Sequence, residues 1–224
     1  MTASLTLHPI GVIRTDKSLK FDAPHQPNRT LNERSEIELI KGKDFEQALR
    51  DLDGFEYIWL VWWFHRNSNW KPMVMPPRGK EKRRGVFATR SPHRPNPIGL
   101  TAVPLLSVKS RKLIVGTNDL VDGTPILDIK PYLTSADCFP EVKQGWIAEI
   151  EKEDKEGPKF EIRYSKKAEK QLAWLSDKNI NFMPRAAELL SRDPSPHRTR
   201  RISEIKGANL FRMGCGAWRV FFVL

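Results

Sequence analysis

The sequence predicts a mainly β protein with an N-terminal β-barrel domain, residues 1–150, and a small C-terminal α+β domain, residues 158–224. Three observations support this prediction. Short apolar stretches alternate with turn residues through the first part, with few helical patterns between them, which is typical of a closed or nearly closed sheet. A run of charged residues at 149–159 then marks a linker. Beyond it, two amphipathic helical patterns precede a hairpin pattern.

The first part carries one helical pattern among its predicted strands. Asp44 is a good cap for a helix at 45–52, in which apolar residues recur at spacings of three and four. The stretch 55–65 is apolar on both alternating faces, so we expect it at the centre of the sheet or against a partner subunit. The predicted strands, separated by turn residues, are 7–15, 37–40, 55–65, 85–89, 100–108 and 112–117, with an extended end at 128–132.

The second part is predicted to combine short strands with two helices. Residues 160–163 indicate a strand, and Ser165 is placed to cap a helix that ends near Asp177. A second helix is expected at about 183–192. The chain then forms a hairpin that turns around 214–216.

The composition indicates a soluble, cytoplasmic protein that binds a polyanion. The 224 residues carry a net charge of +11, with basic runs at 80–84 and 197–201. Such a surface attracts nucleic acid at long range, although a charge that serves only solubility is the alternative. No apolar run approaches the roughly 20 residues that span a bilayer, and the N-terminus lacks a signal-peptide pattern. Cys138 and Cys215 show no pairing pattern, so we expect reduced thiols.

One stretch, residues 85–101, interrupts the apolar pattern with a rigid polar loop. Its three prolines exclude helix and remove backbone donors. Gly99 lets the backbone turn or approach another group closely. Arginine, histidine, asparagine, serine and threonine side chains are therefore held on a scaffold that loses little entropy on binding, which is how a preorganised ligand site is built. A proline-rich turn with solvated arginines is the alternative.

Several common chemistries lack their sequence signature. No G-x-G-x-x-G follows a strand and opens a helix, so the sequence disfavours a Rossmann-type methyltransferase. No P-loop, G-x-S-x-G or H-E-x-x-H is present. The histidines and cysteines never approach zinc-ligand spacing, so we expect no metal. Asp119, Asp122 and Asp128 could form a divalent-ion cluster, but loop aspartates are more often turn formers.

Five segments of the first 135 residues carry a resemblance to a known family. They are IGVIRT at 10–15, PHQP at 24–27, the run from Trp59 to His65, ATRSPHRPNPIGLT at 88–101 and DLVDGTPILDIKPYL at 119–133. In these segments the sequence resembles the TrmO family of tRNA methyltransferases, which use S-adenosylmethionine and a β-barrel. Long irregular strings of this kind seldom recur by chance.

The resemblance implies a cofactor site for S-adenosylmethionine in the barrel domain. Arg90 can fork onto the cofactor carboxylate, and backbone groups near Leu100 and in 116–118 can read the adenine edge. His25 stands where the family usually has arginine, and a histidine reaches less far. The positions that match the family's cofactor contacts are His25, Gln26, Pro27, His65, Arg66, Arg90, Leu100, Gly116, Thr117, Asn118 and Asp119.

The resemblance also implies a tRNA substrate, methylated at N6 of the N6-threonylcarbamoyladenosine beside the anticodon. Because this nitrogen belongs to a urea, its lone pair is delocalised and a general base is useful. Asp128, Asp119 and His65 are candidates for the base, in that order. The family further suggests a homodimer.

Candidate substrate contacts come from the proline loop, the strand after it and the basic run. Arg94, Asn96 and Lys130 could bind the threonyl carboxylate or nearby phosphates, and Arg83 and Arg84 could steer the RNA backbone. An internal ion pair that closes the barrel is an equal alternative for the segment 128–130.

Two other function classes stay open at this point. A non-catalytic basic tRNA-binding module would carry the same basic runs and barrel, but it would not need cofactor-contacting positions in three separate segments. A ribonuclease in the C-terminal part would need a convergent acid, base and phosphate-binding group. That part offers only a basic cluster on a predicted loop, consisting of His197, Arg198, Arg200 and Arg201.

Overall fold

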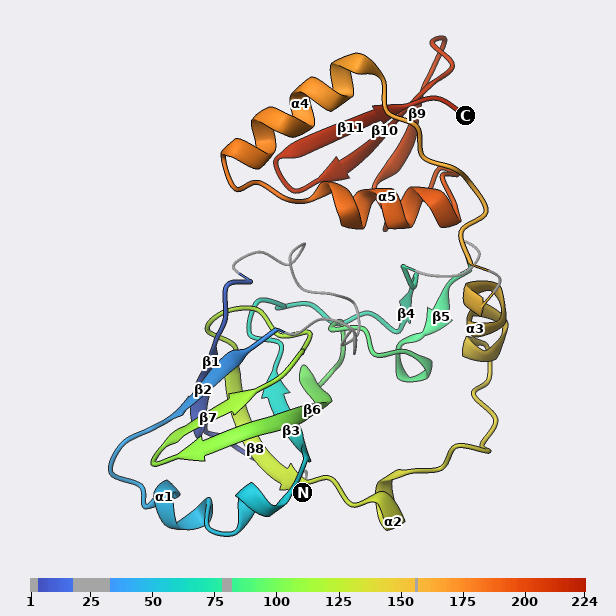
Figure 1. Ribbon diagram of the computed structural model, residues 1–224. Coiled ribbons are helices and arrows are strands. Elements are labelled where there is room, and N and C mark those ends of the chain that lie inside the picture. Colours follow the sequence, from blue (N-terminus) through green and yellow to red (C-terminus); the bar gives the residue numbers. More distant parts are fainter. Residues whose placement is uncertain (1–3, 18–32, 78–81, 156) are drawn as a thin grey trace. The chain divides into compact units, whose positions relative to one another are not determined.

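The computed structural model describes residues 4–17, 33–77, 82–155 and 157–224. The chain divides into two compact units, one of Met1–Val74 with Arg84–Pro140, here called the barrel unit, and one of Met75–Arg83 with Glu141–Leu224, here called the C-terminal unit (Figure 1). The predicted cofactor contacts His25, Gln26 and Pro27 lie outside the described residues.

The barrel unit contains a closed antiparallel barrel of six strands in the order β1-β2-β7-β6-β3-β8 (Figure 1). Strand β1 closes the barrel by pairing with both β2 and β8. The prediction of a mainly β fold with an N-terminal barrel is confirmed. The strands are β1 (Gly11–Arg14), β2 (Ser35–Leu39), β3 (Tyr57–Trp63), β6 (Ile98–Lys109), β7 (Lys112–Val115) and β8 (Pro125–Pro131).

Strand β3 lies inside the sheet, with β6 on one side and β8 on the other. Its alternating residues Ile58, Leu60 and Trp62 point into the barrel core and are buried. The core also receives inward residues from the other strands, among them Ile13, Ile37, Val103, Leu113 and Ile126. The outward face of β3 is apolar as well, which explains why the sequence shows no alternation there.

Two predicted elements of the barrel unit differ from the structure. The expected strand at 85–89 is a short β5 (Arg84–Gly85), paired with β4 (Met73–Val74), followed by the 3-10 turn η2 (Val86–Ala88). The expected helix at 45–52 splits into α1 (Phe45–Ala48) and the 3-10 turn η1 (Leu52–Gly54). Asp44 makes no side-chain cap, because its φ of 53° places it in the left-handed region instead of the extended one.

The charge run expected as a linker is partly helical. Helix α3 (Ile147–Lys155) covers most of it, after a single turn α2 (Thr134–Asp137) that follows the barrel. Alternating Glu and Lys residues are good helix formers, so a charged segment of this length need not be extended.

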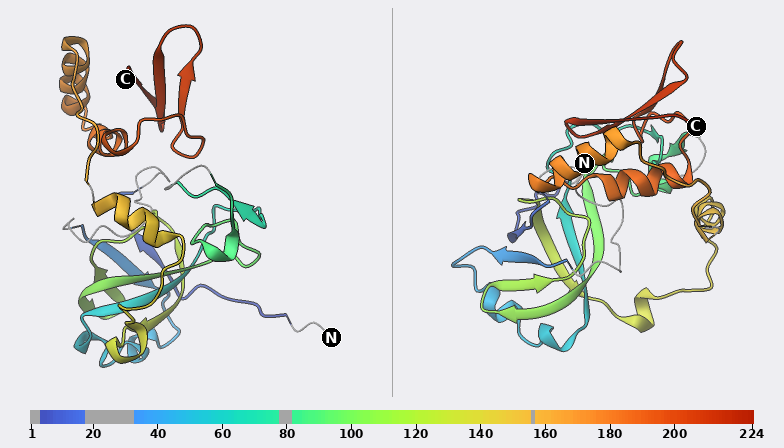
Figure 2. Two further views of the ribbon diagram at one scale, coloured as in Figure 1. Left: turned by 90° about the vertical axis from the view of Figure 1, so that its right-hand side faces the viewer. Right: turned by 45° about the horizontal axis from the view of Figure 1, so that its top comes forward.

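The C-terminal unit has a three-stranded antiparallel sheet in the order β11-β10-β9, with two helices on one side of it (Figure 2). The strands are β9 (Ile202–Ile205), β10 (Leu210–Cys215) and β11 (Trp218–Phe222). Both predicted helices are present, α4 (Lys166–Asp177) and α5 (Met183–Arg192). The Ser165 hydroxyl caps α4 by accepting from the Ala168 N–H (3.2 Å). The strand expected at 160–163 is absent. The third strand of the sheet is β9 instead, a short and polar segment whose sequence pattern does not indicate a strand.

Candidate functional site

Most of the predicted site residues of the barrel unit come from segments that meet at one end of the barrel. The register pairs Trp63 with Ile98, so the end of β3 lies beside the start of β6. Ser35 pairs with Val115, which brings the start of β2 to the end of β7. Since all neighbours are antiparallel, the segments 64–66, 97–101 and 116–124 gather at this same end.

Strand β6 leaves an edge open at this end. Its odd-numbered residues exchange hydrogen bonds with β3, as the Leu105 N–H to Glu56 O bond shows (2.8 Å). The even-numbered residues, including Leu100, therefore direct their N–H and C=O toward the β7 side. Strand β7 pairs with β6 only from Leu105 onward. In the described part of the chain, the backbone groups of Leu100 consequently meet no strand and are suited to read a planar hydrogen-bonding edge.

A chain of three side chains lies beneath this edge. The Trp62 indole N–H donates to the Thr101 hydroxyl (3.1 Å), which in turn donates to Asp119 Oδ1 (2.8 Å). Thr101 is buried on the inward face of β6. Gly99 makes room for Trp62, because a Cβ at this position would lie 2.3 Å from the indole ring. The carboxylate of Asp119 is thereby fixed in one orientation.

Burial raises the pKa of Asp119 above its ordinary value. The Thr101 hydroxyl and the positive charge of Arg90 act in the opposite direction without cancelling the effect. A carboxylate with a raised pKa is a stronger base than an exposed one, and Asp119 is the only carboxyl among the described residues that combines a raised pKa with this barrel end.

The loop from 116 to 120 is held from inside the barrel. Asn118 is completely buried, and its amide donates to Ser35 Oγ (2.9 Å) and Gly116 O (3.1 Å) while its carbonyl accepts from the Leu120 N–H (3.1 Å). The ammonium of Lys17 donates to Asn118 O (2.8 Å) and pairs with Glu33 (2.6 Å). The Asn118 side chain is therefore committed to the loop, and only the backbone atoms of Asn118 can face a ligand.

His65 and Arg66 connect the end of β3 to the neighbouring loop. Arg66 donates to the Asp122 carbonyl (3.2 Å) and to His65 Nε2 (3.3 Å). The Asp122 carboxylate accepts from the Thr15 N–H (3.1 Å). These contacts place both predicted residues at the same barrel end as Asp119.

The proline loop is stiffened by its own side chains. The guanidinium of Arg94 donates to Thr89 O (2.8 Å) and Val86 O (3.2 Å) and lies over the Phe87 ring. The Asn67 amide donates to Pro92 O (2.9 Å), which ties the loop to the end of β3. Arg94 thus has a structural task in the loop.

Two further predicted residues of this loop region are exposed. Asn96 uses its backbone carbonyl to accept from the Ile98 N–H (2.8 Å). The Arg90 guanidinium forms no hydrogen bond with the described residues of the loop, and its charge acts on Asp119. Both residues are therefore accessible to a ligand, and the Arg90 guanidinium can turn toward an anionic group.

Asp128 lies level with Leu100 in the register, but on the outward face of the barrel. It pairs in register with the outward-facing Val61, and its carboxylate forms an ion pair with Lys130 (2.8 Å). Both side chains are about half exposed. The ion-pair alternative for 128–130 is what the structure contains, although it links neighbours on one strand and does not close the barrel.

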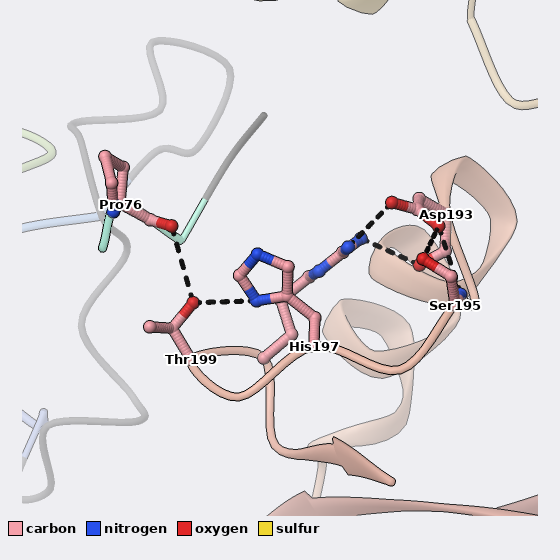
Figure 3. A network of polar contacts seen from close by, with 6 residues as sticks. Pro76, Asp193, Ser195, His197 and Thr199 are labelled. Carbon is pink, nitrogen blue, oxygen red and sulfur yellow. Dashed lines mark hydrogen bonds and ion pairs between the residues drawn. The ribbon is translucent and has the colours of Figure 1, made fainter. Parts of the chain in front are cut away.

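The remaining basic residues belong to different surroundings. Arg84 lies in β5, while Arg83 belongs to the C-terminal unit. In that unit His197 is only 2% exposed, and its Nδ1 contacts the Thr199 hydroxyl (2.9 Å), which donates to Pro76 O (3.5 Å) (Figure 3).

Arg200 in the same cluster is bound to Asp193 (2.6 Å), whose carboxylate also accepts from Ser195 (2.5 Å). Burial pushes the pKa of Asp193 upward, but the bonds from Ser195 and Arg200 outweigh it and hold the pKa below its ordinary value. His197 is too buried to act on an RNA phosphate and Arg200 is paired with Asp193, whereas Arg198 and Arg201 are exposed. The cluster therefore offers cations but no accessible acid or base for a ribonuclease.

Sequence reasoning missed three residues that shape the barrel end, namely Trp62, Thr101 and Lys17. Thr101 is the last residue of the 88–101 string, and its place in that string was the available signal. Within residues 4–17, 33–77, 82–155 and 157–224, no group of three His, Cys, Asp or Glu side chains could hold a metal ion. Over the same ranges, no helix is both long and apolar enough to cross a membrane.

Fold and site together define a class of protein, a closed antiparallel β-barrel with a polar site at one end and an appended α+β unit. Residues 12–138 match the tRNA-methyltransferase O N-terminal domain. The chain belongs to this TrmO family.

Similar proteins agree with this assignment. A tRNA (adenine(37)-N6)-methyltransferase of Escherichia coli K12 is 36% identical over 87% of this chain and 83% of its own length. A probable S-adenosyl-L-methionine-binding protein of Pyrococcus abyssi is 35% identical over 70% of this chain and 86% of its own. The crystal structure of TrmO from Pseudomonas aeruginosa superimposes with a TM-score of 0.59 at 29% identity, covering 94% of this chain and 91% of that one.

Proposed function

We propose that this protein is an S-adenosylmethionine-dependent tRNA methyltransferase that methylates N6 of adenine 37, with N6-threonylcarbamoyladenosine as the acceptor nucleoside. The observation that carries the proposal is the carboxylate of Asp119, oriented by Thr101 beside the open edge of β6. Family membership and the names of the E. coli and P. abyssi relatives support it.

The groups at the barrel end fit the cofactor. Leu100 offers one N–H and one C=O to an adenine edge, and Arg90 offers a guanidinium to the α-carboxylate. The predicted contacts of Gly116 and Asn118 would act through backbone atoms, since glycine has no side chain and the Asn118 side chain is satisfied within the protein. The cofactor supplies an electrophilic methyl group, and the protein's task is to align it with the acceptor nitrogen.

Asp119 is our choice for the general base, ahead of Asp128 and His65. A base must hold its proton more tightly than an ordinary carboxylate to accept one from a urea nitrogen, and burial gives Asp119 this property. Asp128 is exposed and paired with Lys130 on the outward face. His65 accepts from Arg66, which occupies the lone pair that a base requires.

The finer parts of the proposal concern substrate contacts and assembly. Exposed Asn96, and the basic pair Arg83 and Arg84, would contact the RNA, while Arg94 and Lys130 would contribute less because each is engaged in the protein. We also propose a cytoplasmic homodimer. The apolar outward face of β3, where Trp63 is 41% exposed, would form part of the interface.

Mass analysis of tRNA nucleosides tests the proposal. Purified protein and S-adenosylmethionine are incubated with tRNA that carries the threonylcarbamoyl group and with the same tRNA lacking it. We expect a gain of one methyl group only on the modified adenosine. A protein that binds the cofactor but transfers no methyl group to either tRNA would contradict the acceptor, and a protein that binds tRNA without binding the cofactor would favour the non-catalytic module.

A further inference from the structure

The positive charge of the chain is concentrated in its last 68 residues. Residues 157–224 contain 14 Lys and Arg against 6 Asp and Glu, a net charge of +8, whereas residues 1–156 contain 24 against 21, a net charge of +3. The part that contains the family's N-terminal domain is therefore nearly neutral. The electrostatic attraction of the chain for a polyanion resides mainly in the C-terminal unit.

Helix α4 arranges cations and one aromatic ring along a single stripe. Lys170, Trp174 and Lys178 follow one another at a spacing of four residues, and Lys167 lies on the same stripe one turn earlier. Trp174 is 53% exposed. Within the part of the chain that the structure describes, none of these three lysines forms an ion pair. Their charges are thus available to a partner.

Two further aromatic rings extend the exposed ring of Trp174. Trp218 of β11 meets it edge to face (6.4 Å between centroids) and is itself 37% exposed. Phe182 lies nearly parallel to Trp218, with an interplanar angle of 13°. Trp174, Trp218 and Phe182 form a continuous aromatic platform at the edge of the sheet.

A groove between α4 and α5 adjoins this platform through Phe182. Its volume is about 500 Å³, and its walls include Tyr164, Leu172, Asn179, Asn181 and Met183. Aromatic faces next to amide side chains suit a nucleobase, which presents a π surface and a hydrogen-bonding edge together.

We propose that the stripe, the platform and the groove form one surface, here called the α4–α5 surface, which binds a single-stranded segment of RNA. Bases would stack on Trp174, and the phosphates would approach Lys170 and Lys178. The proposal rests on the proposed function, under which the RNA is the tRNA substrate, contacted away from the methylated nucleotide. An RNA partner is favoured over a protein partner because lysine is depleted from protein–protein interfaces, whereas three unpaired lysines match a phosphate backbone.

Binding of a labelled 12-nucleotide single-stranded RNA to the full-length protein, followed by fluorescence anisotropy, tests the stacking contact. Trp174→Ala should weaken binding at least about fivefold, because base–aromatic stacking contributes this much per base. Trp174→Phe should retain most of the affinity. Phe139→Ala is the matched control, since Phe139 is 63% exposed in the barrel unit and outside the proposed surface.

The salt dependence of the same binding tests the phosphate contacts. The double substitution Lys170→Gln and Lys178→Gln should lower the slope of log affinity against log salt by about 1.4, since each phosphate contact to a single strand contributes about 0.7. Lys206→Gln, an exposed lysine on the turn after β9, should leave the slope unchanged.

Three results would overturn the proposal. The wild-type protein could fail to bind the oligonucleotide, or the Trp174→Ala protein could be folded by circular dichroism and bind RNA as wild type does. Alternatively, Trp174→Ala could dissociate a dimer of the protein without changing its RNA affinity. The last would assign the surface to self-association. Cofactor affinity and methyl transfer, measured on the same proteins, report on the proposed function separately, because a wild-type enzyme that binds RNA but methylates no tRNA would contradict only that function.

Discussion

The basic residues of the barrel and those of the α4–α5 surface differ in how they are paired. Several cations of the barrel unit form ion pairs, as in Lys17 with Glu33, Arg111 with Glu46 and Lys112 with Glu36. The C-terminal unit has such pairs too, among them Arg200 with Asp193. On the α4–α5 surface, three lysines have no ion-pair partner within the described residues. The comparison teaches that the overall charge of +11 does not distinguish cations engaged within the protein from cations available to a partner.

The barrel end and the α4–α5 surface also differ in whether their side chains are bonded within the protein. At the barrel end, Asn118 and Thr101 are buried and bonded within the protein, so the site is rigid before any ligand arrives. On the α4–α5 surface, Trp174 and its lysines are exposed and can adapt to an RNA strand. A small cofactor needs the first arrangement, and a flexible polymer tolerates the second.

The largest effect is expected for Asp119→Asn, which removes the proposed base from the rigid region. Methyl transfer should fall about 100-fold or more, because general base catalysis contributes about 10²–10⁴, while the amide oxygen can still accept from Thr101. Wild-type transfer should rise with pH through the pKa of Asp119, which burial raises above its ordinary value, since only the ionised form is a base. Single-turnover rates across pH measure both.

The stability of Asp119→Asn separates a catalytic role from a structural one. Because the folded protein holds the Asp119 proton more tightly than the unfolded chain does, the free energy of unfolding falls as pH rises through the interval between the two pKa values. The variant removes this loss, so at neutral pH it should be at least as stable as wild type. Asp128→Asn is the control for transfer, and equal losses in the two variants would contradict the assignment.

Arg90→Ala tests whether the exposed cation at the barrel end is used. Cofactor affinity should fall by roughly 2 kcal/mol, the contribution of a charge-assisted hydrogen bond. Titration calorimetry with S-adenosylmethionine measures it. Arg50→Ala removes an exposed arginine after α1 and should leave the affinity unchanged. If the folded Arg90→Ala protein binds the cofactor as wild type does, Arg90 is not part of the site.

Gly99→Ala tests the rigidity of the barrel end directly. The added methyl group would overlap the Trp62 ring, so the side chains of the Trp62–Thr101–Asp119 chain must move, at a cost of about 1–3 kcal/mol in the free energy of unfolding. Gly54→Ala is the matched control, because its added methyl group would meet no atom within 4 Å beyond the adjacent residues. Denaturant unfolding compares the two variants. Equal stabilities would show that the barrel end is more adaptable than its contacts imply.

The strands of the barrel were predictable because each carries its own apolar pattern, and the helices α4 and α5 because amphipathic spacing is local. The segment 85–89 was misjudged, because an apolar run before a proline loop does not reveal whether it pairs with another strand. The segment 160–163 was misjudged for the same reason. Pairing is a property of two segments, so a single one cannot disclose it.

The residues of the candidate site also fall into two groups, those that a continuous sequence string reveals and those that depend on a distant partner. Residues within continuous strings, such as Arg90 and Asp119, could be selected from sequence. Lys17 and Thr101 act through partners more than 15 residues away, in buried contacts that the sequence does not display. Asp119 replaces Asp128 as the first choice for the base because only the structure distinguishes an outward-facing carboxylate from one fixed beneath an open strand edge.

The smallest effect is expected for Ser165→Ala, which tests whether the two regions are independent. Loss of the cap leaves the Ala168 N–H without its side-chain acceptor, at a cost of about 1 kcal/mol. Ser176→Ala, near the other end of α4, should cost less. Hydrogen exchange resolved by peptide should show faster exchange in 157–224 and unchanged exchange in the barrel strands, because the cap contacts only α4. Faster exchange in both would mean that the units unfold together, and the rigidity of the barrel end would then depend on the region that carries the RNA surface.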